Sequence, residues 1–265
     1  MITPDFLLTP QQLDVLWSDL GLHHLPYPLD VPSVGRTREE RLRIREEVYA
    51  ELQRNDLAHN GRMDAELEGL LRLLDDHAVS VDAVAHVQRS IRALAASDGK
   101  RAVLAVVDDG KVGLLEIRPT SLAWSITQVL PDGNAGPGHS ISMRAETLEK
   151  AVEFQKNPPE ADEDDPWGDD EMDEREALMK AGLSSDDATF VSELATGRVA
   201  GGQFGVSRGG GGGVRSERAK VLITWFDTSQ GRYIMVNDGE WLSLAPTDND
   251  RIANRIGTLL EAVPA

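Results

Sequence analysis

The stretch that most constrains the fold is 220–227, KVLITWFD, which a short turn joins to a second apolar run at 228–236, TSQGRYIMV. Aromatic and β-branched residues on both sides of a turn are typical of an antiparallel hairpin. Side chains alternate between the two faces of a strand, so one face of the first strand is wholly apolar and suits a core. That face carries Val221, Ile223 and Trp225. The rest of the chain must supply the layers that bury it.

The opposite face of the same strand mixes polar with large apolar side chains. It carries Lys220, Leu222, Thr224 and Phe226. Two interpretations fit this composition: a face that is solvated at its polar positions, or a surface on which another molecule docks. The sequence leaves both open, and in both of them Trp225 belongs to the core and Phe226 does not.

The segments that follow extend the hairpin into a larger sheet module. EWLSLAP at 240–246 predicts another short strand, and 247–263 predicts an amphipathic helix. The apolar residues of this helix recur at helical spacing: Ile252, Ile256, Leu259, Leu260 and Val263. The module is therefore hairpin, strand and helix.

Composition limits the classes of protein to consider. The chain has 265 residues, 40% of them hydrophobic, which is enough for a core in one large domain or two small ones. Its longest apolar run, AVLAVV at 102–107, is far shorter than the roughly 20 residues of a membrane helix, and its N-terminus does not resemble a secretory signal. We therefore expect a cytoplasmic protein with no membrane insertion.

Charge and cysteine content exclude further classes. The net charge of −18 argues against a nucleic-acid partner, because binding to phosphates needs clustered Lys and Arg. The absence of cysteine rules out disulfides, thiolate zinc sites and a cysteine nucleophile, without identifying the compartment.

The N-terminal region predicts three helices and an irregular strap. Thr9, Pro10 and Gln12 give a capping box with proline at the first helical position, and the helix continues to Leu20. Prolines in 21–35 prevent a helix there, and its apolar residues suggest a strap laid over a core. A second helix begins after Thr37 with an apolar stripe of Leu42, Ile44, Val48 and Leu52, and a third covers 63–74.

Three antiparallel strands are expected next, at 79–88, 101–109 and 111–117, and then a helix after Pro119. The later part of the chain has the same order: strands at 201–208, 220–227 and 232–238, and then a helix. Sequence identity between the two blocks is slight. The shared order predicts a pseudo-twofold internal duplication.

An acidic stretch separates the two halves. Residues 160–176, EADEDDPWGDDEMDERE, carry a net charge of −10, and they do not match the ligand spacing of an EF-hand calcium loop. We expect a single domain, 1–265, divided into an N-terminal half, 1–156, an acidic linker, 157–176, and a C-terminal half, 177–265. The glycines at 209–213 lack the residues of a phosphate-binding loop and suit a flexible hairpin tip.

The sequence offers no positive sign of catalysis. The six histidines are scattered without ligand spacing, and no nucleophile elbow is present. We expect no enzyme activity, no cofactor and no metal site. The alternative is an enzyme or small-molecule binder with a cleft between sheet and helical bundle, because catalytic groups can converge in space.

Several phrases resemble the EspG family, the cytosolic secretion-associated proteins of type VII (ESX) secretion systems. They are LTPQQLDVLWSDLGL with PYPLDVPS at 8–33, GGQFGVSR at 201–208, and WFDTSQGRYIMV with EWLSLAP at 225–246. The most specific of them contains Asp227, Thr228, Gly231, Arg232 and Tyr233. The phrases occur in the family's order over nearly the whole chain, whereas the acidic stretch and the pentaglycine segment are not features expected of the family.

The resemblance implies an α+β fold with a central antiparallel β-sheet flanked by helical bundles and a quasi-twofold internal duplication, which agrees with the duplication predicted from the shared order of elements. It also implies a chaperone or adaptor that covers an apolar tip of a PE–PPE substrate in the cytosol and keeps that substrate soluble. The loops 95–101 and 208–218 are candidates for influencing recognition. The expected partner-binding residues are Phe204, Val206, Leu222, Thr224, Phe226, Arg232 and Trp241. A relative that has lost substrate binding and acts as a scaffold remains an alternative, and the sequence fits a monomer or a homodimer.

Overall fold

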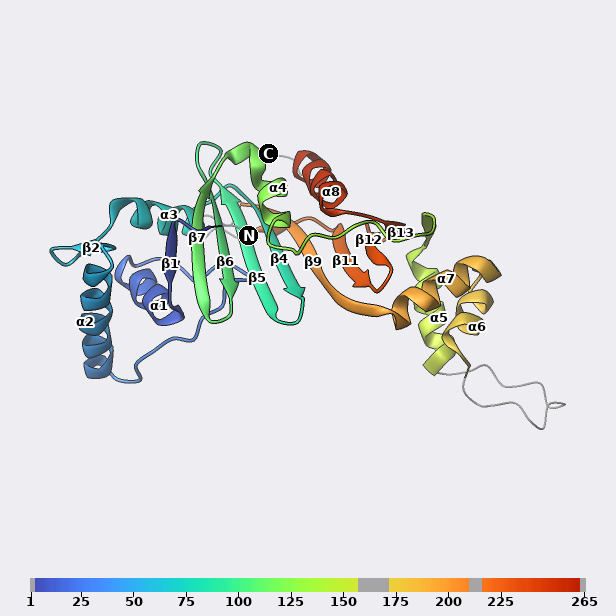
Figure 1. Cartoon of the computed structure of the whole chain (residues 1–265), viewed down its shortest axis with the longest axis horizontal. Helices are drawn as coiled ribbons and strands as arrows, with labels where there is room; N and C mark the ends of the chain where they lie inside the picture. The colour runs from blue at the N-terminus through green and yellow to red at the C-terminus, as the bar shows by residue number, and fades with distance from the viewer. Residues whose placement is uncertain (1–2, 157–171, 210–215, 263–265) are drawn as a thin grey trace. The chain divides into compact units, whose positions relative to one another are not determined.

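The computed structural model describes residues 3–156, 172–209 and 216–262 (Figure 1). Within them the chain is α+β, with antiparallel strands and flanking helices, so the predicted fold class is confirmed. The chain forms two compact units. The first comprises Met1–Pro131, Gly202–Ala219 and Asn249–Ala265, and the second comprises Asp132–Gly201 and Lys220–Asp248. Most of the predicted acidic linker, 157–171, and the glycine-rich segment 210–215 lie outside the described residues.

The first unit is built on a sheet with the strand order β1-β7-β6-β5-β4-β9. These strands are β1 (Phe6–Leu8), β4 (Val79–His86), β5 (Ser90–Ser97), β6 (Ala102–Asp108), β7 (Lys111–Ile117) and β9 (Arg198–Arg208). A short strand, β10 (Glu217–Arg218), pairs with β9. The sequence prediction missed β5, because its SIRALAAS is rich in alanine and serine, which have weak strand propensity. Residues 95–97 of the predicted recognition loop therefore belong to a strand.

Helices and the N-terminal strap cover this sheet. The helices are α1 (Pro10–Asp19), α2 (Arg38–Arg54), α3 (Ala65–Asp75), α4 (Leu122–Thr127) after the 3₁₀ turn η1 (Pro119–Ser121), and α8 (Asn249–Ala262). A small hairpin, β2 (Ala58–His59) and β3 (Arg62–Met63), precedes α3. One apolar cluster joins α1, α2, α3 and the strands, with residues such as Leu16, Leu52 and Leu71 fully buried. The strap contributes Leu29, which is buried in the same cluster.

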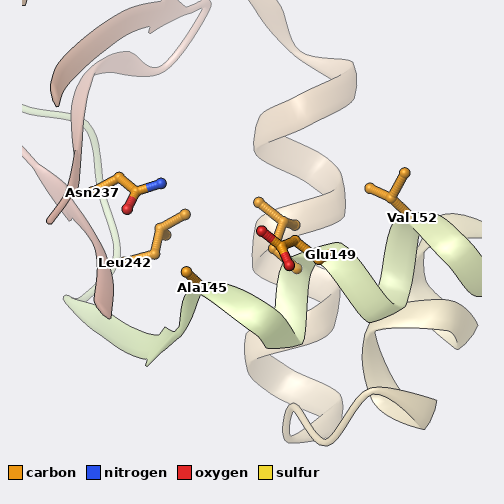
Figure 2. Close-up of a pocket in the computed structure, with 6 residues that line it drawn as sticks. Ala145, Glu149, Val152, Asn237 and Leu242 are labelled. Carbon is orange, nitrogen blue, oxygen red and sulfur yellow. The ribbon is translucent and has the colours of Figure 1, made fainter. Parts of the chain in front are cut away.

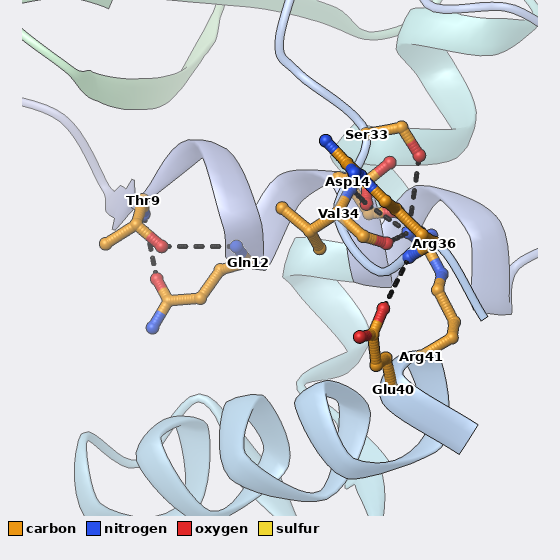
Figure 3. A network of polar contacts seen from close by, with 8 residues as sticks. All are labelled: Thr9, Gln12, Asp14, Ser33, Val34, Arg36, Glu40 and Arg41. Atoms are coloured by element: carbon orange, nitrogen blue, oxygen red, sulfur yellow. Dashed lines mark hydrogen bonds and ion pairs between the residues drawn. The ribbon is translucent and has the colours of Figure 1, made fainter. Parts of the chain in front are cut away.

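A polar network fastens the strap to the first two helices (Figure 3). The Thr9–Gln12 capping box begins α1 as predicted. The Asp14 carboxylate, one turn further on, accepts a hydrogen bond from the backbone N–H of Val34 at 3.1 Å and pairs with the Arg41 guanidinium of α2. Arg41 also donates to the Val34 carbonyl oxygen at 2.7 Å. These hydrogen bonds hold the strap through its backbone groups. An irregular segment needs such side-chain partners, because its N–H and C=O groups have none in a helix or sheet.

Two details of the helix predictions are wrong. Leu42 is 53% exposed although Val48 and Leu52 on the same predicted stripe are buried, because only the later turns of α2 reach the core. The third helix begins after Asp64, whose carboxylate caps the backbone N–H groups of Glu66 and Leu67, so Met63 belongs to strand β3.

The second unit contains the sheet segment β11-β12-β13-β8 and three helices. The strands are β8 (Ile141–Arg144), β11 (Leu222–Thr228), β12 (Gly231–Asn237) and β13 (Trp241–Pro246), and the helices are α5 (Ala145–Lys156), α6 (Glu174–Lys180) and α7 (Ser185–Thr196). The predicted hairpin is confirmed, with Phe226 opposite Tyr233. Helix α6 begins inside the predicted linker, because its Ala177 and Leu178 pack against α5 and α7.

The order of four strands followed by a helix occurs twice along the chain. The first set is β4, β5, β6, β7 and α4, and the second is β9, β11, β12, β13 and α8, with the short β10 between β9 and β11. Each set has one strand more than the repeat predicted from the sequence. The two closing helices, α4 and α8, lie side by side in the first unit (Figure 1).

Candidate functional site

The seven predicted partner-binding residues lie in very different environments. Most of them are buried within the chain itself, with at most 8% exposure: Phe204 and Val206 on β9, Thr224 and Phe226 on β11, and Arg232 on β12. Leu222 is half-buried, and Trp241 is 45% exposed. In this structure only Leu222 and Trp241 of the predicted set are open to a partner.

Phe226 was expected outside the core, and this expectation is wrong. Its side chain is 8% exposed and packs with Leu194, Tyr233 and Leu244, and its ring stacks on that of Tyr233 with centroids 5.7 Å apart. Helix α7 supplies Phe190, Val191 and Leu194 to this side of the sheet. The mixed face of β11 is therefore covered by helix at Phe226, while Trp225 on the other face is also buried.

Arg232 has a structural role in this fold. It is fully buried, and its guanidinium makes two hydrogen bonds with the Asp227 carboxylate, at 2.7 and 2.8 Å. The guanidinium carbon also lies 4.7 Å from the centre of the Trp225 ring. A buried charge of this kind needs a paired carboxylate, so the Asp227 and Arg232 of the family-like phrase stabilise the hairpin from within.

The sheet face that carries Phe226 and Tyr233 opens at its far end into a shallow groove. The strand register places Leu222 opposite Asn237 and Asn237 opposite Leu242, so these three side chains share one face. Helix α5 runs along this end, and together they leave a groove of about 330 Å³ (Figure 2). Its lining is Ala145, Leu148, Glu149, Val152, Asn237 and Leu242.

The lining of the groove is mainly apolar and partly accessible. Leu242 forms its buried base, and Val152 on α5 is 41% exposed. The two polar groups are the Glu149 carboxylate and the Asn237 amide, which turn toward the space between helix and strands (Figure 2). An apolar groove with a few polar groups at its border has the composition of a protein-docking surface.

Among its described residues, helix α5, which forms one wall of the groove, supplies no cation that pairs with Glu149. The described ion pairs of α5 join Lys150 to Glu146 at 3.9 Å, and none of the described residues forms an ion pair with Glu149. The groove therefore presents apolar surface beside an unneutralised negative charge.

Trp241 lies on the opposite face of β13 from the groove, because it alternates with Leu242. The guanidinium of Arg144 on β8 lies 4.8 Å from its ring, and the same Arg144 pairs with Glu240 at 2.7 Å. Trp241 and the groove are therefore separate surfaces at one end of the second unit.

A model of the EspG family matches residues 9–258 of this sequence. The chain belongs to the EspG family. The match spans both compact units and covers all of the groove-lining residues.

The fold of this EspG-family chain is similar to that of a solved structure. The structure is that of the Mycobacterium tuberculosis type VII secretion system chaperone EspG5, in complex with the PE25–PPE41 dimer. The TM-score is 0.73 at 12% sequence identity, and the similarity covers 98% of this chain and 96% of that one. A search of curated protein sequences gives no match to this chain.

In the part of this EspG-family chain that the structure describes, no cluster of three or more His, Asp or Glu side chains is arranged to hold a metal ion. Histidine–carboxylate contacts there fasten secondary structure: His139 meets Asp187 near the start of α7 at 2.8 Å, and His23 meets Asp75 at the end of α3 at 3.0 Å. The His139 contact holds the pKa of Asp187 below its usual value, and a hydrogen bond from Ser184 adds to the effect. Among the described helices, none combines the length and the apolarity needed to cross a membrane.

Sequence reasoning missed the α5 side of the groove. The periodicity of 145–156 indicated a helix but not which of its apolar residues stay exposed. The sequence carries only a weak signal that Val152 is exposed. Val152 follows the buried Ala151 and precedes Glu153, so it lies at the border of the apolar stripe of the helix.

Proposed function

We propose that this EspG-family chain is a cytosolic chaperone or adaptor that binds PE–PPE-type substrates of a type VII secretion system and keeps them soluble for export. The observation that carries the proposal is the family match over 9–258. The similarity of its fold to that of a chaperone solved with a bound PE25–PPE41 dimer supports the same class of partner. We further propose that the chain acts as one functional domain with an acidic linker at 157–176, and not as an enzyme.

We propose the α5 groove as the docking surface. Masking an aggregation-prone tip requires apolar surface that is accessible before binding, and the exposed Val152, which lines the groove together with Leu242, meets that requirement. Of the residues predicted from the sequence, Leu222 remains a candidate because it shares the groove's sheet face, and Trp241 remains one as an exposed aromatic side chain. Thr224 and Phe226 of that set lie on the same sheet face as the groove but are buried.

The experiment is co-expression of the chain with PE–PPE pairs from its own genome, followed by gel filtration and titration of the pair that co-elutes. Val152→Asp places a carboxylate in the groove and should weaken binding about thirtyfold, the loss of a typical interface hot spot. The matched control is Val199→Asp, because Val199 is 69% exposed on β9 and does not line the groove.

Two outcomes would contradict the proposal in different ways. If no PE–PPE pair is solubilised or co-elutes, the substrate class is wrong. If a pair binds and both valine variants bind it equally well, the groove is the wrong surface. A melting temperature close to that of the parent chain shows that Val152→Asp acts on binding and not on folding.

A further inference from the structure

The α5 groove combines an apolar lining with one charged group whose position is fixed by the helix. Glu149 is one turn before the exposed Val152 and one turn after Ala145, and all three line the groove. Its carboxylate turns toward Asn237 and Leu242 across the groove (Figure 2). A side chain inserted between α5 and β13 must therefore approach Glu149.

The surroundings do not neutralise this carboxylate. Lys150, the next residue, pairs with Glu146, and the ammonium of Lys180 on α6 lies 5.9 Å from the Phe154 ring. Arg144, the residue just before α5, pairs with Glu240 at 2.7 Å and not with Glu149. Among the described residues, Glu149 therefore brings an unpaired negative charge to the groove.

Covering Glu149 with a purely apolar partner would remove water from a charged group without replacing its hydrogen bonds. The cost of desolvating a carboxylate exceeds what a single apolar contact returns. A partner that brings a cation to this point avoids that cost and gains a charge-assisted hydrogen bond. The Asn237 side-chain oxygen already accepts a hydrogen bond from the backbone N–H of Gly239 at 2.8 Å, so Glu149 is the acceptor that such a cation meets.

We propose that Glu149 is a specificity-determining residue that selects partners carrying a Lys or Arg next to the apolar residue that enters the groove. The occupant is thus an apolar side chain with a basic neighbour, presented by the substrate tip. The inference rests on the proposed function and adds to it a rule for which substrates are accepted. Like-charged tips, with Asp or Glu at that position, are rejected by repulsion.

The test uses the full-length chain and the PE–PPE pair that co-elutes with it. Glu149→Gln keeps the size of the side chain and removes the charge, and it should weaken binding about fivefold, whereas Glu149→Lys should weaken it about fiftyfold by placing like charges together. Glu153→Gln and Glu153→Lys are the matched controls, because Glu153 is also exposed, lies one turn further along α5 and does not line the groove. Their affinities should stay within about twofold of the parent value, as is usual for charges outside the contact.

A charge swap gives the decisive readout. Replacing a Lys or Arg of the substrate tip by Glu should weaken binding to the parent chain, and the same substrate variant should regain affinity for Glu149→Lys. Equal effects of the Glu149 and Glu153 variants, or no recovery in any swapped pair, would overturn the inference while leaving the chaperone proposal standing. Binding of no pair by the parent chain would overturn both. If the chain alone forms a dimer and Glu149→Lys abolishes that dimer, the groove binds a second copy of the chain, and the inference about the substrate is wrong.

Discussion

The two compact units bury their apolar residues in different ways. The first unit has a large cluster in which α1, α2, α3, the strap and strands of the sheet take part. In the second unit smaller clusters form around Phe226 and Tyr233, around Ala177 and Leu178, and around Ile141 and Leu242. The first arrangement resembles an ordinary domain core, and the second resembles helices packed on a sheet with little depth.

This difference has a functional consequence. A deep core leaves few accessible apolar side chains that belong to a common surface, whereas shallow clusters leave some at their borders. The groove lies at such a border, where Leu242 is buried, Leu148 is half-buried and Val152 is exposed. The proposed docking surface therefore lies in the unit with the smaller clusters.

The strongest test of this difference between the two units is to remove one large buried side chain from each of them. Phe226→Ala and Leu71→Ala should each lower the free energy of unfolding by about 3–5 kcal/mol, the usual cost of large-to-small changes in a core. Amide hydrogen exchange should rise mainly in α7 and β11–β13 for Phe226→Ala, and mainly in α1–α3 and β5–β7 for Leu71→Ala. If both variants raise exchange equally in all described segments, the units unfold as one and the distinction is only geometric.

Much of the fold could be predicted because its signals are local. The capping boxes at Thr9 and Thr37 and the hairpin around Phe226 and Tyr233 depend on residues a few positions apart, and the structure confirms them. Strand β5 was missed for the opposite reason. Its alanines enter a strand because the neighbouring strands β4 and β6 pair with it on both sides, which is tertiary information.

The candidate site was harder to predict than the fold. Alternation correctly separated Trp225 from Phe226, but only the packing of α7 decides that both faces of β11 are covered. Arg232 shows the same limit, because a surface-type residue becomes buried when Asp227 and Trp225 surround it. The groove itself needs α5 and β13 together, and nearly a hundred positions separate them in the chain.

A smaller effect is expected at the glycines of the 132–140 segment, which packs closely on the hairpin of the second unit. A Cβ on Gly136 would overlap the ring of Tyr233, whose hydroxyl donates to the Pro137 carbonyl oxygen at 2.9 Å. Gly136→Ala should therefore destabilise by about 1–3 kcal/mol through overpacking, measured by urea unfolding. Gly257→Ala in α8 of the first unit is the control, because nothing lies within 4 Å of its added methyl group and helix propensity should stabilise it by about 0.4–1 kcal/mol. If both variants change the free energy of unfolding in the same direction, the 132–140 segment moves to make room for the added methyl group.

The smallest effect should be a pH dependence that arises in the first unit. His77 follows α3 and is buried, with Nδ1 2.9 Å from the Leu74 carbonyl oxygen. Burial lowers the pKa of His77, although that hydrogen bond and the nearby Asp76 and Asp75 oppose the shift. The unfolded chain therefore takes up this proton at a higher pH than the folded chain, so stability is complete above the ordinary histidine pKa of about 6.5 and falls as the pH drops below it.

His77→Asn tests this sign, because asparagine keeps an N–H donor for Leu74 and cannot become a cation. Urea unfolding at pH 7.5 and 5.5 should show a smaller loss of stability on acidification for His77→Asn than for the parent chain. His24→Asn changes an exposed histidine of the strap and should leave the parent's pH dependence as it is. Asp187 of the second unit does not contribute in this range, because its pKa is lowered in the folded chain and has the ordinary Asp value of about 3.9 in the unfolded chain, so it stays ionised in both states above pH 5.5. If His77→Asn loses as much stability as the parent chain, the acid sensitivity comes from groups other than the buried histidine of the first unit.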